Sequence, residues 1–336
     1  MADDRLTIYD FNRSKNPDGT QAKIVEILAQ QNPAIQDAPA YPSNAEIGHR
    51  VTVQKSLPTV ATAKINKGIG RSKGQTEQMV DAIGYWAARS EIDPRIRKIQ
   101  GDSAYMSRRT SENRMFAEAF SQATCNALFY GNHALDESSF DGLAPRMGSL
   151  NTNSFIDPFC LNMAASVAVA GADGCSIYVV DWGPDACHLI YPKEYSGGMG
   201  LVVEDLPDRD GRDVDGNDMR VDVTEFHWFL GLAVEDRRHM ARLANIDLSD
   251  ALLAAPTQGF LLDELEKILS YMPDPGGATR VMYGPTFLEP GWRKQARMRA
   301  NQALTIQDYL QKQTVHVWGV PFRPVRQLST AEATVS

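Results

Sequence analysis

The residues of this chain that could carry out chemistry begin with a glycine cluster, Gly68-Ile69-Gly70-Arg71-Ser72-Lys73-Gly74. Its spacing is GxGxxxG, whereas a dinucleotide-binding turn has GxGxxG between a buried strand and a helix. A phosphate-binding loop of the GxxxxGK[ST] type needs a lysine followed by serine or threonine, and that order is missing here. We therefore interpret the cluster as the flexible end of a hairpin.

A second candidate for chemistry is the acidic run from Asp208 to Asp218. A calcium-binding EF-hand loop needs D-x-[DN]-x-[DN]-G and a glutamate at position twelve, between two helices. With Gly216 at position six, position one is Gly211 and position twelve is Asp222, so one ligand is lost and another is shorter. An exposed hairpin with two glycine turns explains the run better. The weak candidates for a cation site are Asp213, Asp215 and Asp218.

Histidine and cysteine spacing indicates no metal centre or catalytic centre. The six histidines form no HxH or HExxH pattern, the four cysteines form no CxxC pair, and GxSxG does not occur. His188 follows Cys187 in a predicted strand, where neighbouring side chains point to opposite faces. The pair Glu235-Asp236 fits a solvated surface. The sequence predicts no catalytic residue, no cofactor and no metal site beyond the weak acidic run.

Composition places the chain among ordinary globular proteins. Hydrophobic residues make up 43% and charged residues 23% of the 336 positions, with a formal net charge of −8. These values exclude a wholly disordered, collagen-like or coiled-coil chain, and the length corresponds to about two domains. The cysteines fit reduced thiols of a cytoplasmic product. We expect no signal peptide and no membrane span, because no apolar stretch is long enough.

The first 75 residues predict an arm followed by a hairpin. Prolines interrupt residues 1–45 repeatedly, which favours extended backbone, and only residues 22–30 have helical spacing. Residues 50–53 and 59–65 alternate β-branched residues on either side of a turn at 56–58, which predicts a hairpin. Because an isolated hairpin holds no core of its own, we expect it to lie against another surface.

The rest of the chain predicts a mixture of helices and strands, and hence an α+β fold. The longest periodic stretch, 103–130 with Gly131 as its C-cap, would form a helix about 40 Å long. Further helices are predicted at 76–89, from Asp93-Pro94 onward, at 257–272 and at 293–301. Strands are predicted at 176–181, 187–191, 224–234 and 314–318.

The net charge is unevenly distributed along the chain. Residues 50–73 carry six basic residues and no acidic one, and residues 289–327 carry seven basic and two acidic residues. Residues 89–114 have seven basic and four acidic residues, whereas residues 200–222 have eight acidic and three basic ones. Solvated faces would account for any single segment. Taken together, the segments indicate that the acidic and basic regions face different partners, including copies of the same chain or a polyanion.

Taken in order, these segments resemble the major capsid proteins of tailed bacteriophages, in particular the epsilon15-like short-tailed phages. The matching features are the proline-broken arm, Leu57-Pro58-Thr59-Val60, Lys64-Ile65-Asn66-Lys67-Gly68, and the helix 103–130 followed by Phe140-Asp141-Gly142-Leu143. The strongest part is the closing Trp318-Gly319-Val320-Pro321-Phe322-Arg323 with Leu328, Glu332 and Val335. The resemblance covers most of the chain and is least distinctive over 161–285.

The resemblance implies the Johnson fold, the coat fold shared by tailed phages and herpesviruses. Its parts would be an N-terminal arm (1–45), an E-loop (46–75), a P-domain with a spine helix (76–160, with 286–336 returning to it) and an A-domain (161–285). It implies pentamers and hexamers that build an icosahedral shell around double-stranded DNA, in a virion assembled in the bacterial cytoplasm. Portal, scaffolding and decoration proteins would be further partners, and no membrane would be involved.

Two sets of basic residues acquire expected roles from this resemblance. The E-loop lies across a neighbouring subunit, so its basic residues are the expected intersubunit contacts: Arg50, Lys55, Lys64, Lys67, Arg71 and Lys73. The spine helix lies toward the interior, so the residues expected to face DNA are Arg95, Arg97, Lys98, Arg108 and Arg109. Two alternatives stay open, an encapsulin-like compartment and a cytoplasmic enzyme or ligand binder with its site in 161–285.

Overall fold

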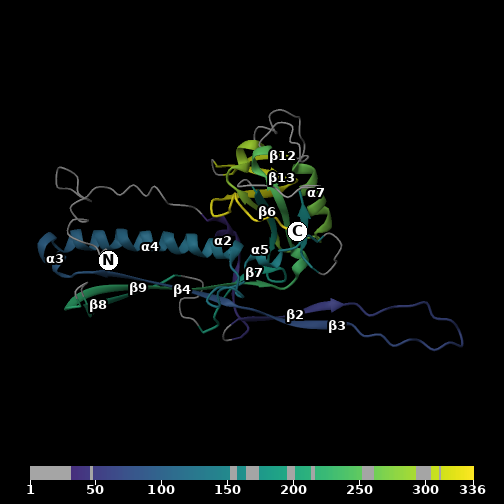
Figure 1. Cartoon of the computed structure of the whole chain (residues 1–336), viewed down its shortest axis with the longest axis horizontal. Helices are drawn as coiled ribbons and strands as arrows, with labels where there is room; N and C mark the ends of the chain where they lie inside the picture. Colours follow the sequence, from purple (N-terminus) through teal and green to yellow (C-terminus); the bar gives the residue numbers. More distant parts are fainter. Residues whose placement is uncertain are drawn as a thin grey trace. The chain divides into compact units, whose positions relative to one another are not determined.

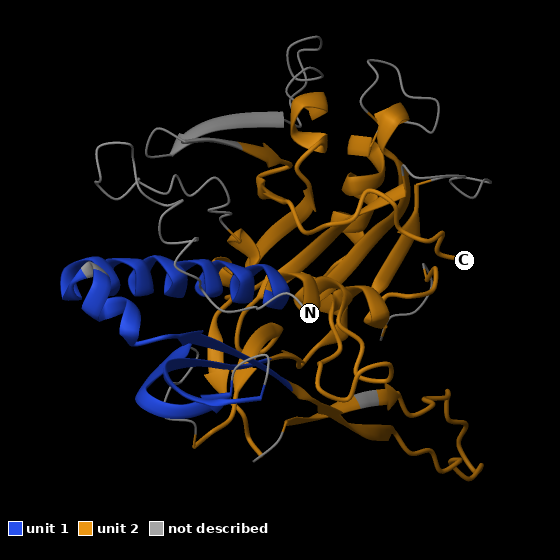
Figure 2. Ribbon diagram, turned by 60° about the vertical axis from the view of Figure 1, so that its left-hand side comes forward, with its two compact units in different colours: residues 1–31, 84–124, 195–230 blue, residues 32–83, 125–194, 231–336 orange. Residues whose placement is uncertain are grey.

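The computed structural model describes residues 32–45, 48–151, 157–163, 174–194, 201–212, 216–251, 261–292, 304–309 and 312–336. These residues divide into two compact units, each assembled from separate stretches of chain (Figure 2). The helix unit contains the described residues within 84–124 and 195–230. The sheet unit contains those within 32–83, 125–194 and 231–336. The predicted division into arm, E-loop, P-domain and A-domain stays a prediction.

The helix unit takes most of α4 (Asp102–Tyr130), a long unbroken helix in Figure 1. The short helix α3 (Arg95–Gln100) precedes it, and the Asp93 carboxylate accepts the Arg95 backbone N–H at 2.8 Å. This bond satisfies one of the donors that a helix start leaves without a partner. The helix predicted from Asp93-Pro94 onward is confirmed.

The helix unit also contains β8 (Val202–Arg212) and most of β4 (Ile83–Ile92) and β9 (Asp218–Val234). Strands β8 and β9 form an antiparallel hairpin with Val203 opposite Phe226. The Phe226 ring stacks on Phe116 of α4, with ring centroids 4.9 Å apart. The described residues of the acidic run lie on this hairpin, as predicted, although Gly211 is paired within β8 and is not a turn residue.

The sheet unit is built around β6 (Gly174–Trp182), all of whose residues are buried. Across the sheet the strands follow the order β12-β13-β14-β11-β6-β7, and the end of β9 pairs with β7. Strand β10 lies antiparallel to β6 and parallel to β5, and β1 lies parallel to β7. The bounds are β1 (Ala40–Pro42), β5 (Phe159–Asn162), β7 (Cys187–Tyr191), β10 (Met240–Asp247), β11 (Thr279–Pro285), β12 (Leu304–Tyr309), β13 (Lys312–Val317) and β14 (Val320–Val325).

Helix α7 (Leu261–Tyr271) supplies the apolar cover of this sheet. Leu261, Leu265 and Ile268 recur at helical spacing, are buried, and belong to one hydrophobic cluster with Ile177 of β6 and Leu243 of β10. The remaining short helices are α2 (Pro33–Asp37), α5 (Leu143–Arg146), η1 (Arg237–His239) and α6 (Leu248–Ala251). Across the described part of the chain, no helix combines the length and apolar character needed to cross a membrane.

Several predicted elements are confirmed. The helix at 103–130 is α4, and the strands at 176–181, 187–191, 224–234 and 314–318 correspond to β6, β7, β9 and β13. The helix at 257–272 is confirmed over its described part as α7. The helices predicted at 22–30 and 293–301 lie outside the described residues.

Two predictions near the hairpin are wrong. Residues 76–89 form β3 (Gln75–Asp81) and most of β4, not a helix, and from Tyr85 onward β4 alternates between more and less exposed side chains. The strand predicted at 59–65 is absent, because β2 (His49–Ser56) pairs with β3 instead, with Val51 opposite Met79. The apolar residues of 76–89 fitted both the 3.6-residue period of a helix and the two-residue period of a strand. Pairing with a distant strand decided in favour of the strand.

Candidate intersubunit surface

The hairpin of β2 and β3 continues into residues 57–74, which contain neither strand nor helix (Figure 1). We call this segment the extended loop. Four of its large apolar side chains are 74–94% exposed: Leu57, Val60, Ile65 and Ile69. Because monomeric proteins rarely display many large apolar groups together, such a segment indicates a contact surface.

The six basic residues predicted to make intersubunit contacts are all exposed. Arg50 and Lys55 lie on β2, and Lys55 forms an ion pair with Glu77 on β3 at 2.9 Å. The other four lie on the extended loop among its apolar residues: Lys64, Lys67, Arg71 and Lys73. The loop therefore offers apolar groups for burial and cations for steering toward an acidic surface.

The root of this hairpin is fixed to the end of β9 by a buried aspartate. The carboxylate of Asp81, 6% exposed, accepts from Nη2 of Arg146 at 2.7 Å and from the Val234 backbone N–H at 3.1 Å. Gly48 has φ +123°, and a Cβ there would lie 2.9 Å from the Asp81 carbonyl oxygen. Glycine is thus required where the chain passes Asp81 to enter β2.

The same root brings together three side chains that sequence reasoning missed. Nε2 of His49 lies 2.8 Å from Oε1 of Glu235, although the two residues are 186 positions apart. His188, on β7, faces both of them. Burial, followed by the nearby His49, lowers the pKa of His188. No motif links these positions, and only strand alternation hinted that His188 points away from Cys187.

The basic residues of α3 and α4 have different surroundings. Arg95 and Lys98 are exposed, and Arg95 pairs with Asp93 at 2.7 Å. Arg108 is half-buried. Arg109 is only 8% exposed, and its Nη2 contacts Asp205 at 2.6 Å and Thr224 at 2.7 Å. The guanidinium of Arg109 therefore joins α4 to the hairpin of β8 and β9.

Arg97 is also engaged within the helix unit. Its guanidinium lies 4.7 Å from the centroid of the Tyr105 ring and 3.4 Å from Asp222. The Tyr105 hydroxyl donates to Asp222 at 2.6 Å. Burial and this carboxylate raise the pKa of Tyr105, so the phenol stays protonated. Tyr105 and Asp222 thus form a buried anchor for the start of α4.

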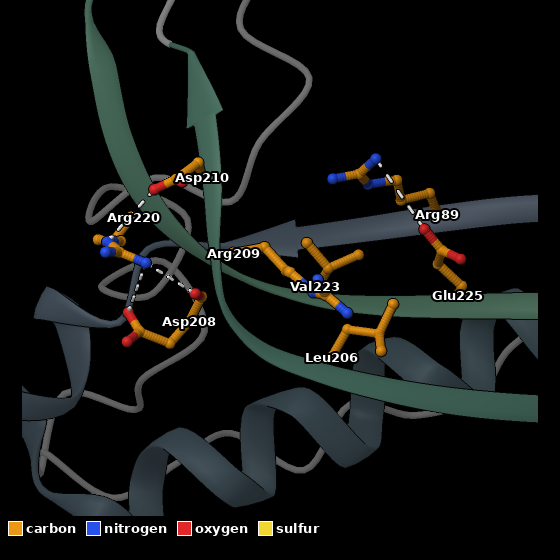
Figure 3. Close-up of a pocket in the computed structure, with 8 residues that line it drawn as sticks. All are labelled: Arg89, Leu206, Asp208, Arg209, Asp210, Arg220, Val223 and Glu225. Atoms are coloured by element: carbon orange, nitrogen blue, oxygen red, sulfur yellow. Dashed lines mark hydrogen bonds and ion pairs between the residues drawn. The ribbon is translucent and has the colours of Figure 1, made fainter.

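A cavity of about 540 Å³ lies among β4, β8 and β9, and Figure 3 shows its lining. Arg220 lies 3.9 Å from Asp208 and 3.4 Å from Asp210, and Arg89 lies 4.0 Å from Glu225. The lining residues are Arg89, Leu206, Asp208, Arg209, Asp210, Arg220, Val223 and Glu225. Its three cations and three anions balance, and Arg89 and Arg220 pair with acidic residues of the lining, which is typical of a solvated polar surface.

Of the three weak candidates for a cation site, only Asp218 lies among the described residues. Asp218 is exposed and lies 3.4 Å from the guanidinium of Arg212. Asp213 and Asp215 lie outside the described residues. Gly216, with φ +86°, occupies the left-handed region that favours glycine in a turn. The cation site stays a prediction.

Comparison with known proteins connects these surfaces to a family. The family model "Major capsid protein GP7" matches residues 16–336. A chain of the bacteriophage Epsilon15 structure, derived from cryo-EM and modeling, is 24% identical, with a TM-score of 0.79 over 100% of this chain and 98% of that one. The bacteriophage JBD30 capsid is 11% identical, with a TM-score of 0.49 over 91% and 94%. No curated protein matches the chain.

The similarity to the Epsilon15 chain extends over the whole fold, so the predicted Johnson fold is confirmed. The family match covers nearly all of the chain and assigns it a structural role in a virion rather than an enzymatic one. The exposed extended loop agrees with that role. The chain belongs to the Major capsid protein GP7 family and is a bacteriophage coat protein with the Johnson fold.

Proposed function

We propose that the chain assembles into pentamers and hexamers of an icosahedral shell that encloses double-stranded DNA. The observation that carries this proposal is the extended loop, whose four large apolar side chains are 74–94% exposed in the single chain. Full burial of one such side chain contributes about 1.5–3 kcal/mol. A neighbouring subunit that covers several of them would therefore gain substantial stability at every repeated contact.

The six basic residues would act in the same contact. Charges at the rim of an interface mainly raise the association rate and fix the register. In this proposal the E-loop comprises residues 46–75, within the predicted arrangement of arm, P-domain and A-domain. Portal, scaffolding and decoration proteins are proposed as further partners, and the virion is assembled in the host cytoplasm.

Removal of the extended loop is expected to abolish shell formation without unfolding the chain. Residues 57–74 are replaced by Asn-Gly, which can close the hairpin because Ser56 is paired with Gln75. We expect soluble, folded protein that forms no shells in electron micrographs. As a control, Leu135→Ser removes an apolar side chain that is 87% exposed on a different loop. The control should assemble normally, and normal shells from the shortened chain would contradict the proposal.

We further propose that Arg95 and Lys98 face the packaged DNA. Both are exposed on α3, and Arg95 also pairs with Asp93. Arg97 is exposed as well but contacts the buried Asp222, whereas Arg109 is buried against Asp205. The double variant Arg95→Glu/Lys98→Glu is expected to form shells that retain less nuclease-protected DNA, because four charge units change at a surface facing phosphates. Contacts of this kind are nonspecific and weaken steeply with salt.

The matched control is Lys267→Glu/Arg326→Glu, which changes the charge equally at exposed positions of the sheet unit. DNA content per shell is measured over a series of salt concentrations for both variants and the parent chain. We expect only the α3 variant to lose DNA. Equal DNA content in the two variants would show that α3 does not face the genome.

A further inference from the structure

We propose that His49, His188 and Glu235 form a site for one divalent transition-metal ion of the zinc class at the root of the hairpin. One ligand atom from each residue lies within 4.8 Å of the other two. The His49 and His188 rings meet edge to face, with centroids 5.5 Å apart. Two imidazoles and one carboxylate, with a fourth position left to water, are a recurrent zinc donor set.

The donor types determine which metals fit. Neutral imidazole together with carboxylate suits zinc, cobalt, nickel and iron, whereas magnesium and calcium prefer all-oxygen sites. Ligand atoms of a tetrahedral zinc site lie about 3.3 Å apart, given Zn–N bonds of about 2.0 Å. The three ligand atoms therefore need to approach one another by at most about 1.5 Å on binding. The ion would replace the proton shared by His49 and Glu235 and release it on binding.

Burial makes the histidines unusual. His188 is only 3% exposed, and its Nδ1 is buried with no hydrogen-bond partner among the described residues. Nδ1 of the half-buried His49 also has no partner within that part of the chain, but the ion would bind His49 through Nε2, the nitrogen that faces Glu235. A buried polar atom left without a partner destabilises the fold, and a bound ion is one of the recognised explanations. Nδ1 of His188 is thus a buried nitrogen that the described part of the fold does not satisfy.

The backbone holds the three ligands in place. His188 lies opposite Ala233 in the pairing of β7 with β9, and the Glu235 N–H donates to the Ala186 carbonyl at 2.8 Å. His49 lies opposite Asp81, whose carboxylate accepts the Val234 N–H. Since each ligand is on an anchored strand or directly after one, the site is largely organised before binding. A metal there would tie the first residue of β2 to the central sheet.

Metal binding is tested on the untagged full-length chain after removal of metals with a chelator. Zn²⁺ is titrated by calorimetry, and Co²⁺ absorption reports the ligand geometry. We expect one Zn²⁺ per chain. His49→Gln and Glu235→Gln should each weaken binding by at least the about 10–100-fold that loss of an outer-shell partner costs. Zn²⁺ should also raise the melting temperature of the parent chain and not of these variants.

The control is His133→Gln, because His133 is exposed on a separate loop. It should bind Zn²⁺ as the parent chain does. Circular dichroism identifies any variant that fails to fold, and Glu235→Gln, which preserves the shape of the side chain, then decides the result. No Zn²⁺ uptake by the parent chain would leave only the His49–Glu235 hydrogen bond and overturn the proposal. If His49→Gln and Glu235→Gln both bind Zn²⁺ as the parent chain does, the metal lies elsewhere and the proposal is equally overturned.

Discussion

Replacing Arg242 with methionine is expected to lower the free energy of unfolding by about 3–5 kcal/mol, because it leaves a buried carboxylate without its cation. Nη2 of Arg242 lies 2.9 Å from Oε2 of Glu332, and the two side chains are 6% and 7% exposed. Nε of Arg242 donates to Ser176 at 3.1 Å, and Nη1 donates to the Met147 carbonyl at 3.1 Å. Each nitrogen of the guanidinium thus donates to a group of the sheet unit.

The Glu332 carboxylate is equally enclosed. It accepts from the hydroxyls of Tyr130, Ser176 and Tyr178, and burial with this negative charge raises the pKa of Tyr130. The Glu332 backbone N–H donates to the Gly174 carbonyl at 2.8 Å. The network therefore fastens the C-terminal segment to the first residue of the central strand β6.

Urea denaturation of the unassembled chain measures this effect, since assembly would add stability of its own. The double variant Arg242→Met/Glu332→Leu should recover much of the loss, because neither charge is then buried alone. Lys267→Met is the control, since it breaks an exposed pair with Glu264 that solvent screens, and it should leave stability nearly unchanged. An Arg242→Met variant as stable as this control would refute the structural role of the network.

The structure also shows what the C-terminal residues that resemble the capsid family do in the fold. Leu328 and Val335 are buried, and the Val335 N–H and carbonyl both bond to the Asn245 amide at 2.9 Å. Trp318 and Gly319 have φ of +51° and +82° in the turn between β13 and β14. The residues that carried the resemblance are therefore those that turn, bury or fasten the end of the chain.

Local pattern predicted helix α4 and the strands β6, β7, β9 and β13, but it failed where the partner surface of a segment lies outside the single chain. The second half of helix α4 has apolar residues spaced by three and four, from Met115 to Leu128, and a glycine follows its last turn, so local pattern alone identified it. Residues 59–65 have equally strong strand propensity, yet Val60 and Ile65 are 91% and 94% exposed on the extended loop. Their partner surface is outside the single chain in the proposed assembly, so no pattern within the chain could have revealed it.

The functional surfaces also include features that the sequence reveals and features that only the folded structure reveals. The excess of basic residues on the extended loop is visible in sequence, because charge is a property of each residue. Burial of Arg109 is not visible, since it depends on Asp205 and Thr224 of a distant hairpin. The cluster of His49, His188 and Glu235 is formed only when β2, β7 and the end of β9 meet. Long-range strand pairing, not local propensity, creates such sites.

Substituting alanine for Gly142 is expected to destabilise the sheet unit by more than the about 1–3 kcal/mol of ordinary overpacking. A Cβ at this position would lie 2.6 Å from the Ala127 carbonyl oxygen and 2.8 Å from that of Leu128. The obstructing atoms are backbone atoms at the end of α4, so no side chain can turn aside. The Gly142 N–H donates to the Gly131 carbonyl at 2.8 Å, which holds the loop against the helix.

Thermal melting of the unassembled chain tests this prediction, with Gly148→Ala as the matched control. A Cβ at Gly148 would meet its nearest atom, the Pro145 carbonyl oxygen, at 3.4 Å, which is ordinary contact. Alanine there should leave stability unchanged or raise it slightly by restricting the unfolded chain. Equal melting temperatures for the two variants would mean that the loop moves away from α4 at little cost. A large loss confined to Gly142→Ala would show that glycine in the Phe140-Asp141-Gly142-Leu143 segment is required for close packing, with the buried Phe140 and Leu143 on either side.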